Sequence, residues 1–327
     1  MIRGQKQTGF TIVELLIVVV VIAILAAITI VAYNGITNRT KDTAVKADIE
    51  NGVKRLEVVK LQSGTEMYPA SLSAANIVAS SGNTYYYQYN SLDNSYCLES
   101  SNGSLRWYAS SSTTSPAVGR CGADGMVGHW NFDGGANDTS GNGLNGTVSG
   151  ATLTTGQDGS ANGAYLFSGA AASITMGNST LFNKPDLTLS VWARSTNLAS
   201  VGTLIAKEGK QKYRFNAGGT AVGMLASSTT GWTDTYNCPV SVAVNTWYHV
   251  VYTISSSTGR MKLYVNGSQI CDVAGPVITG YGTNDVVVGA YNTGGTEGFV
   301  GSLDDARFYG RALTGAEIKS LYDQGAE

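Results

Sequence analysis

The sequence has 327 residues and a formal net charge of −2, with 43% hydrophobic and only 13% charged residues. This length predicts two or three folding units, and the apolar fraction excludes a disordered chain. The low net charge gives no global basic field, which excludes a nucleic-acid binder that works by charge alone. The 41 Gly and 18 Tyr, among many Ser, Thr and Asn, are typical of extracellular β structure.

The first predicted element is an apolar helix behind a short basic leader. Residues 10–33 contain one formal charge, Glu14, and about 20 such residues cross the ~30 Å hydrocarbon core of a bilayer. A secretory signal peptide would instead have a shorter apolar core followed by a small-residue cleavage site. Here the basic leader, residues 1–9, ends in Gly9 before the apolar segment begins. We therefore expect residues 10–33 to stay in the mature chain as a single-pass anchor.

The sequence Gly9-Phe10-Thr11-x-x-Glu14-Leu15 resembles the processing site and N-terminal helix of type IV pilins. This resemblance implies that a prepilin peptidase cleaves after Gly9 and methylates the new N-terminal Phe10. It also implies that Glu14 pairs with the free amine of Phe10 in a neighbouring subunit and so sets the filament register. A carboxylate in a membrane helix is costly and usually has a partner. The alternative is that Glu14 merely reaches the lipid headgroups.

Beyond the anchor, the same helix is predicted to continue to about residue 61 with one apolar face. Gly35 and Gly52 are weak points in it, since each Gly costs about 1 kcal/mol relative to Ala in a helix. Type IV pilins often carry Gly at the position of Ala23 and Pro at that of Val31, and their absence leaves open whether this segment melts partly in a filament. The apolar positions are Val45, Ile49, Val53, Leu56 and Val59.

Residues 62–124 are predicted to form a compact head containing a small antiparallel sheet. Its first strand carries three consecutive tyrosines, which we interpret as packing against the helix, with ligand binding as the alternative. A Ser/Thr-rich segment at 110–125 is the predicted linker to the next domain. The three expected strands are 84–89, 95–99 and 105–108.

The four cysteines all follow the apolar segment, and an even number in an exported chain indicates disulfides. No pair has CxxC spacing and the chain has 2 His, which argues against a zinc site. Of three connectivities we favour Cys97–Cys121 with Cys238–Cys271, because each bridge then stays within one predicted domain. Each would contribute about 3–4 kcal/mol in the chain-entropy model. A reduced, cytoplasmic protein is the alternative, and the N-terminal segment argues against it.

Residues 125–327 show many short strand patterns separated by Gly and Asn, which predict a β sandwich. The pair Asn266-Gly267 between two alternating segments is a strong hairpin signal. Thr314 and Glu317 form a capping box that opens a short C-terminal helix.

This region resembles the laminin-G-like, concanavalin-A-like jelly-roll domains. The resemblance implies an all-β jelly-roll sandwich after an α+β pilin made of a long helix and a small antiparallel sheet. The matching segments are Gly128–Asp133, Asp138–Gly146, Ala164–Phe167, Asn245–Val250, Leu263–Gly267 and Gly301–Leu313.

A calcium site is one hypothesis for the sandwich. The loop of residues 133–145 is rich in side-chain oxygens, and calcium takes six to eight oxygen ligands. The family resemblance adds Asp304 to the oxygens around Asp138 and Asn142. The alternative is a loop in which these side chains cap backbone groups.

A glycan site is a second hypothesis. Residues 231–237, expected to form a loop, place Trp232 and Tyr236 beside polar side chains, as aromatic platforms for a sugar. The alternative is that Trp232 packs beneath the loop. Three other tryptophans are predicted to lie in the core, namely Trp130, Trp192 and Trp247.

The sequence gives little sign of catalysis. His129 and His249 lie in apolar strand-like segments, where a structural role is the more common one. The adjacent acids Asp304 and Asp305 alternate to opposite faces of a strand, and no GxSxG, HExxH or P-loop pattern occurs. We therefore predict that the chain is not an enzyme.

These observations predict a type IV pilus subunit that displays a lectin-like domain for adhesion to glycans or cell surfaces. Before assembly it would be anchored in the cytoplasmic membrane, where its partners are the prepilin peptidase and the pilus assembly machinery. It would then enter an extracellular filament, either a homopolymer or a mixed one. A nucleic-acid partner is not expected. One alternative is a pseudopilin of a type II secretion-like system, for which the sandwich is large. A DNA-uptake pilin would need a basic stripe, and a membrane-tethered glycan-processing protein would need two carboxylates about 5–10 Å apart.

Overall fold

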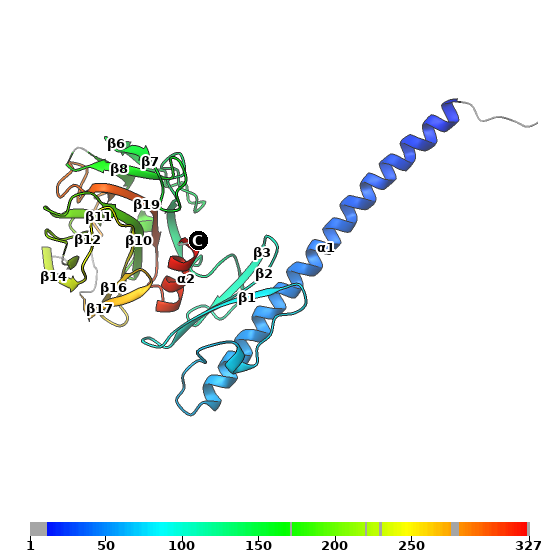
Figure 1. Ribbon diagram of the computed structural model, residues 1–327, viewed down its shortest axis with the longest axis horizontal. Coiled ribbons are helices and arrows are strands. Elements are labelled where there is room, and N and C mark those ends of the chain that lie inside the picture. Colours follow the sequence, from blue (N-terminus) through cyan, green and yellow to red (C-terminus); the bar gives the residue numbers. More distant parts are fainter. Residues whose placement is uncertain (1–11, 171, 220, 229–230, 276–280, 326–327) are drawn as a thin grey trace, which may run out of the picture.

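The computed structural model describes residues 12–325 except 171, 220, 229–230 and 276–280, with Glu14 and residues 221–237 described as backbone only. The predicted processing residues Gly9 and Phe10 lie outside this range. A long helix projects from a small sheet, and a β sandwich lies on the other side of that sheet (Figure 1).

The long helix, α1 (Ile12–Gln62), is continuous. Its C-terminal half buries Val45, Ile49 and Leu56 completely, residues that recur on one helical face. A Cβ on Gly52 would lie 2.5 Å from Cδ2 of Leu98. Gly52, a weak point of the helix by its sequence, therefore lets the helix approach the sheet closely.

The head sheet has the antiparallel order β1-β2-β3-β4. The three strands expected from the sequence are confirmed, each slightly longer, and a two-residue fourth strand follows. Tyr85 and Tyr87 pack against α1 with the buried ring of Tyr96, so the packing interpretation of the tyrosine cluster is confirmed for these two. The bounds are β1 Thr84–Asn90, β2 Ser95–Asn102, β3 Leu105–Ser110 and β4 Ala117–Val118, after a short 3-10 helix, η1, at Ser73–Ala75.

Buried Asp48 ties the segment between α1 and the sheet to the helix. Its carboxylate accepts hydrogen bonds from the backbone N–H of Ser80 at 3.1 Å and from Nδ2 of Asn83 at 2.7 Å. The Tyr85 hydroxyl donates to the Asp48 carbonyl at 2.8 Å. These bonds fix the loop before the head sheet, although it has almost no regular structure.

The sandwich consists of two antiparallel sheets. One has the order β17-β16-β15-β10-β19-β8-β7, with β5 paired to β19, and the other has the order β14-β13-β12-β11-β18-β9-β6. The first sheet contains β5 Met126–Trp130, β7 Thr152–Thr154, β8 Ala164–Ser168, β10 Leu187–Ser195, β15 Tyr248–Ser255, β16 Arg260–Val265, β17 Ser268–Ala274 and β19 Val300–Tyr309. The second contains β6 Thr147–Ser149, β9 Ser173–Gly177, β11 Gly202–Lys207, β12 Gln211–Phe215, β13 Ala221–Ser228, β14 Gly231–Pro239 and β18 Val286–Val288, and η2 lies at Thr180–Phe182.

Alternating residues of the two sheets fill the core between them, which contains Trp130, Phe167 and Tyr252. The predicted hairpin is confirmed, since Asn266 and Gly267 both have positive φ, 51° and 74°, as a type I′ turn requires.

Both predicted disulfides are present. Cys238–Cys271 joins β14 to β17, the edge strands of the two sheets, and so closes one side of the sandwich. Cys97–Cys121 joins β2 of the head to the segment that precedes β5.

The C-terminal helix α2 (Gly315–Gly325) lies between the sandwich and the head (Figure 1). Its Ile318 and Leu321 pack on Val251 and Tyr264, on the outer face of the first sandwich sheet. Its other side contacts β1 and β2 of the head. Residues 110–125, the predicted linker, therefore connect two units that are also held together by α2.

Candidate functional site

The N-terminal half of α1 presents apolar side chains on all its faces. Exposure reaches 87% at Ile12, 73% at Val31 and 66% at Ile36. A helix that is hydrophobic all round is stable only when buried, so lipid or other helices must cover it. By length and composition, α1 is the one helix in the described part of the chain that fits a membrane span.

Two threonine hydroxyls within this half are satisfied locally. The hydroxyls of Thr29 and Thr37 donate to the carbonyls of Leu25 and Tyr33, four residues earlier, at 2.7 and 2.9 Å. In apolar surroundings such groups need a partner, and the helix supplies it. Glu14 lies in the first turns of α1, but its side chain is not described.

The junction of head and sandwich contains a buried ion pair. Arg311 donates to both carboxylate oxygens of Glu317 at 2.9 Å, and Glu317 is completely buried. Burial works to raise the pKa of Glu317, but the hydrogen bonds and charge of Arg311 outweigh it and hold the pKa below its usual value. Glu317 also accepts from the Thr314 N–H at 2.8 Å while Thr314 Oγ1 accepts from the Glu317 N–H. The predicted capping box is confirmed.

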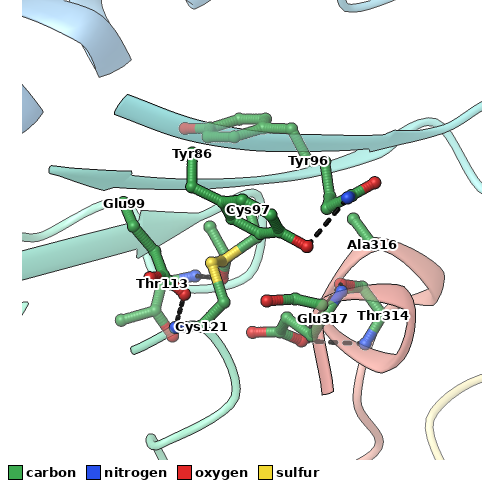
Figure 2. Close-up of a disulfide and its surroundings, with 12 residues drawn as sticks. Tyr86, Tyr96, Cys97, Glu99, Thr113, Cys121, Thr314, Ala316 and Glu317 are labelled. Carbon is green, nitrogen blue, oxygen red and sulfur yellow. Dashed lines mark hydrogen bonds between the residues drawn. A yellow bond between two sulfur atoms is a disulfide. The ribbon is translucent and has the colours of Figure 1, made fainter. Parts of the chain in front are cut away.

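The Cys97–Cys121 bridge packs directly on α2. Figure 2 shows it facing the first turn of α2, where Ala316 and Glu317 lie, and Cys97, Cys121 and Ala316 belong to one buried cluster. Glu99 accepts from the Cys121 N–H at 2.7 Å and from Nε2 of Gln324 at 3.1 Å. Burial raises the pKa of Glu99. One head carboxylate therefore binds both the disulfide segment and the end of α2.

The head also caps α2. The N–H of Gly315 donates to the Asp93 carboxylate at 2.7 Å, and the N–H of Ala316 donates to Oγ of Ser95 at 3.1 Å. A Cβ on Gly315 would lie 2.2 Å from Nδ2 of Asn90. The helix N-terminus thus approaches the turn between β1 and β2 so closely that a larger residue would have to displace the Asn90 side chain.

The three residues predicted as calcium ligands each bond to backbone groups. The Asp138 carboxylate accepts from the backbone N–H groups of His129, Ser140 and Leu144 at 2.9–3.0 Å. Burial works to raise the pKa of Asp138, but these bonds lower it overall. Asn142 donates through Nδ2 to a backbone carbonyl at 2.9 Å. Asp138 and Asn142 thus make backbone contacts of the kind that the capping alternative predicts.

Asp304 lies elsewhere, on β19, where it accepts from the Gln157 N–H at 2.8 Å. Burial, followed by the charges of Asp305 and Asp133, raises the pKa of Asp304 to about 7 despite that bond. Within the described ranges, no group of three or more His, Cys, Asp or Glu side chains is arranged to hold a metal ion.

The predicted glycan platforms lie on a strand and not in a loop. Trp232 and Tyr236 belong to β14, in register with Ser227 and Met224 of β13. The two threonines and two aromatic residues of this segment favour a strand, and the loop prediction did not take them into account. The side chains of both residues are not described.

The same sheet carries a polar cluster that the sequence did not predict. Glu297 accepts from Nζ of Lys212 at 2.8 Å and from Nη1 of Arg214 at 3.0 Å, and the Lys212 ammonium lies 4.3 Å from the ring centroid of Tyr291. Lys212 and Arg214 alternate along β12 with Tyr213, which is in the core. Glu297 is 85 residues from Lys212 in the chain, so no local pattern predicts the cluster.

The two histidines have structural partners. His249 is buried, binds the Ser190 hydroxyl at 2.8 Å, and its pKa falls to about 3 because of burial. His129 Nε2 lies 2.7 Å from Asp305, which also binds Arg307 in two bonds. Asp305 is thus held in an ion pair, while Asp304 binds a backbone amide.

Two family models match the chain. Residues 4–30 match the prokaryotic N-terminal methylation motif, and residues 167–319 match the concanavalin A-like lectin/glucanases superfamily. The major component PilA4 of the type IV wide pilus of Thermus thermophilus is 31% identical over 107 residues, which cover 32% of this chain and 82% of that protein.

Solved structures resemble the sandwich in fold. The binding domain of Paraclostridial Mosquitocidal Protein 1 has a TM-score of 0.50 at 19% identity and covers 62% of this chain. The botulinum neurotoxin serotype G binding domain has a TM-score of 0.50 at 18% identity and covers 61%. The chain spans about half the length of each, 52% and 51%. Domain 4 of AbnA, an extracellular arabinanase from Geobacillus stearothermophilus solved with arabinotriose, has a TM-score of 0.47 at 20% identity, over 60% of this chain and 98% of that domain.

Proposed function

The chain belongs to the type IV pilin family, and from this premise we propose that it is a filament-forming pilus subunit that displays a glycan-binding sandwich. Both resemblances drawn from the sequence, to type IV pilins and to concanavalin A-like domains, are confirmed. The precursor is anchored in the membrane by the apolar half of α1 and is assembled into an extracellular pilus.

The processing steps follow from the methylation motif. The prepilin peptidase removes residues 1–9 and methylates Phe10. In the filament, Glu14 pairs with the amine of Phe10 in a neighbouring subunit, because an unpaired carboxylate in an apolar core is costly.

One structural observation favours a filament subunit over a secretion pseudopilin. The head sheet separates α1, on one of its faces, from α2 and the sandwich on the other (Figure 1). A filament that gathers the apolar halves of α1 at its axis therefore carries every sandwich on its outer surface. A domain on the outer surface can contact other cells or surfaces. A pseudopilin, which acts as a piston in secretion, does not need such a domain.

The glycan part of the proposal rests on the sandwich family and on a largely buried polar cluster of its second sheet. The Lys212–Glu297–Arg214 cluster beside Tyr291 combines an aromatic ring with fixed charged groups, and a cation over such a ring is a stable arrangement. Pilins and lectin-like domains are structural and binding modules. We infer that this chain has no catalytic activity of its own, since its paired acids are held in unrelated contacts.

The test uses cells that express the chain, labelled with immunogold against residues 126–327, and sheared filaments applied to a glycan array. We expect label along fibres and binding to a subset of glycans. A Glu14→Ala variant, which keeps the sandwich intact, should remain in the envelope and give no labelled fibres. Label confined to the envelope for the natural chain contradicts the filament proposal, and an empty array contradicts only the glycan proposal.

A further inference from the structure

A cleft of about 410 Å³ lies where the pilin part meets the sandwich. One wall comes from the end of α1 and the turn between β1 and β2, and the other comes from β15 and β16. Residues 312–314, which lead into α2, lie between the walls. Ligand pockets typically measure about 300–1,000 Å³, so the cleft has room for a short saccharide.

The lining of this cleft is polar and rich in hydroxyl groups. Ala312, Leu313 and the ring of Tyr68 are the apolar groups among the residues that line it. Hydroxyls both donate and accept hydrogen bonds, and therefore match the alternating donors and acceptors of a sugar ring. Within the part of the chain that the structure describes, the Thr253 and Thr258 hydroxyls make no hydrogen bond. The hydroxyl residues of the lining include Ser95, Ser111, Thr253, Ser255, Thr258 and Thr314.

The sandwich wall carries two cations that share one carboxylate. Arg260 donates through Nε to Asp272 at 2.7 Å, whereas Nζ of Lys262 lies 3.8 Å from that carboxylate, beyond hydrogen-bond distance. Two positive charges against one negative leave an excess on this wall. All three donors of the Lys262 ammonium remain available among the described residues.

The pilin wall carries Lys60, whose Nζ lies 3.9 Å from Glu57 and donates to the Tyr68 hydroxyl at 3.3 Å. This lysine also keeps free donors. The acid that lines the cleft, Asp93, is already engaged with the N-terminus of α2, where a negative charge is offset by the helix dipole. The charge that the cleft can offer to a ligand is therefore positive.

We propose that this cleft binds an acidic saccharide, with Lys60 of the pilin part and Lys262 of the sandwich on its carboxylates and the hydroxyl side chains on its sugar rings. The inference rests on the proposed glycan-binding function and names a ligand class and a site for it. The site exists only while head and sandwich are docked, because each contributes one wall.

The experiment measures binding of oligogalacturonate, and of neutral oligogalactan of matched length, to the full chain in detergent micelles. Lys60→Gln and Lys262→Gln are compared with Lys54→Gln, an exposed lysine of α1 outside the cleft. We expect the two cleft variants each to weaken oligogalacturonate binding at least fivefold, and the control to leave it unchanged. Binding should also weaken with added salt, as charge pairing near a surface does.

Thermal unfolding of each variant shows whether the fold is kept, and Thr253→Val provides a third cleft variant without a change of charge. Oligogalacturonate binding that is absent, or that is insensitive to both lysine variants, overturns the inference. If neutral glycans bind while oligogalacturonate does not, the glycan function stands and this site fails. If no saccharide of any kind binds, the glycan proposal itself fails.

Discussion

Asp93 in the head accepts a hydrogen bond from the backbone N–H of Gly315, the first residue of α2, at 2.7 Å. The two residues are 222 positions apart in the chain. Helix N-caps usually come from the residue just before the helix, whereas here a second cap comes from the other folding unit. The contact makes the start of α2 a shared element of head and sandwich.

Asp93→Ala removes this cap, and we expect a loss of about 1 kcal/mol in the free energy of unfolding, as for other lost N-caps. Chemical denaturation of the full chain in detergent measures it. Glu50→Ala, which removes a half-exposed partner of Lys46 at 3.9 Å, is the control and should change stability by less than about 0.5 kcal/mol. Equal effects of the two substitutions would show that Asp93 does not couple the domains.

The disulfides give a second prediction. Replacing Cys97 and Cys121 together by Ser opens a loop with a sequence separation of 24, for which the chain-entropy model gives about 3 kcal/mol. Because the bridge also packs on Ala316, we expect the double variant to expose α2 to limited proteolysis before the sandwich unfolds. The matched control is the double Ser variant of Cys238 and Cys271, which should leave α2 protected. Protection of α2 in both variants would contradict the role of the first bridge in docking.

Much of this architecture is predictable from local sequence. The apolar anchor, the Asn266-Gly267 turn and the Thr314–Glu317 capping box all depend on neighbouring residues, and the structure agrees with each. The docking of α2 on the head is not predictable in this way, because Asp93 and its partner are 222 positions apart and rules of local spacing do not reach that far. The Lys212–Glu297 pair is not predictable from local sequence for the same reason.

The calcium hypothesis meets a different limit of the sequence. Asp138 and Asn142 have the side-chain oxygens that calcium takes, yet the sequence cannot show whether a carboxylate is already occupied by backbone N–H groups. Asp138 is occupied. Asp304 is less fully occupied by backbone N–H groups, and its protonation leads to a third prediction.

The pKa of Asp304 is raised to about 7 by burial and by neighbouring acids, against about 3.9 in an unfolded chain. The folded state therefore holds this proton more tightly, so stability is greatest below about pH 4 for this group and falls as the pH rises to about 7. Asp304→Asn removes the ionisation, and we expect a flatter dependence of Tm on pH between about 4 and 7, with a higher Tm at about pH 7.5.

Calcium would act on the same group, because a cation favours the ionised carboxylate. If calcium binds at Asp304, it raises the Tm of the natural chain at about pH 7.5 and does nothing for Asp304→Asn. An unchanged Tm in both proteins would remove calcium from this site. A pH dependence that is equally steep in Asp304→Asn would show that other groups control it.

The two glycines in the middle of α1 give a matched pair of substitutions. Gly35 has nothing within 4 Å of the place where a Cβ would stand, whereas at Gly52 the Cβ would lie 2.5 Å from Cδ2 of Leu98. Ala is favoured over Gly in a helix by about 1 kcal/mol, so Gly35→Ala should be neutral or stabilising. Gly52→Ala adds the same helix propensity but must push Leu98 away from the helix, and overpacking of this kind costs about 1–3 kcal/mol. Denaturation of both variants in detergent measures the difference, and a Gly52→Ala variant as stable as Gly35→Ala would mean that the helix does not sit as closely on β2 as the structure shows.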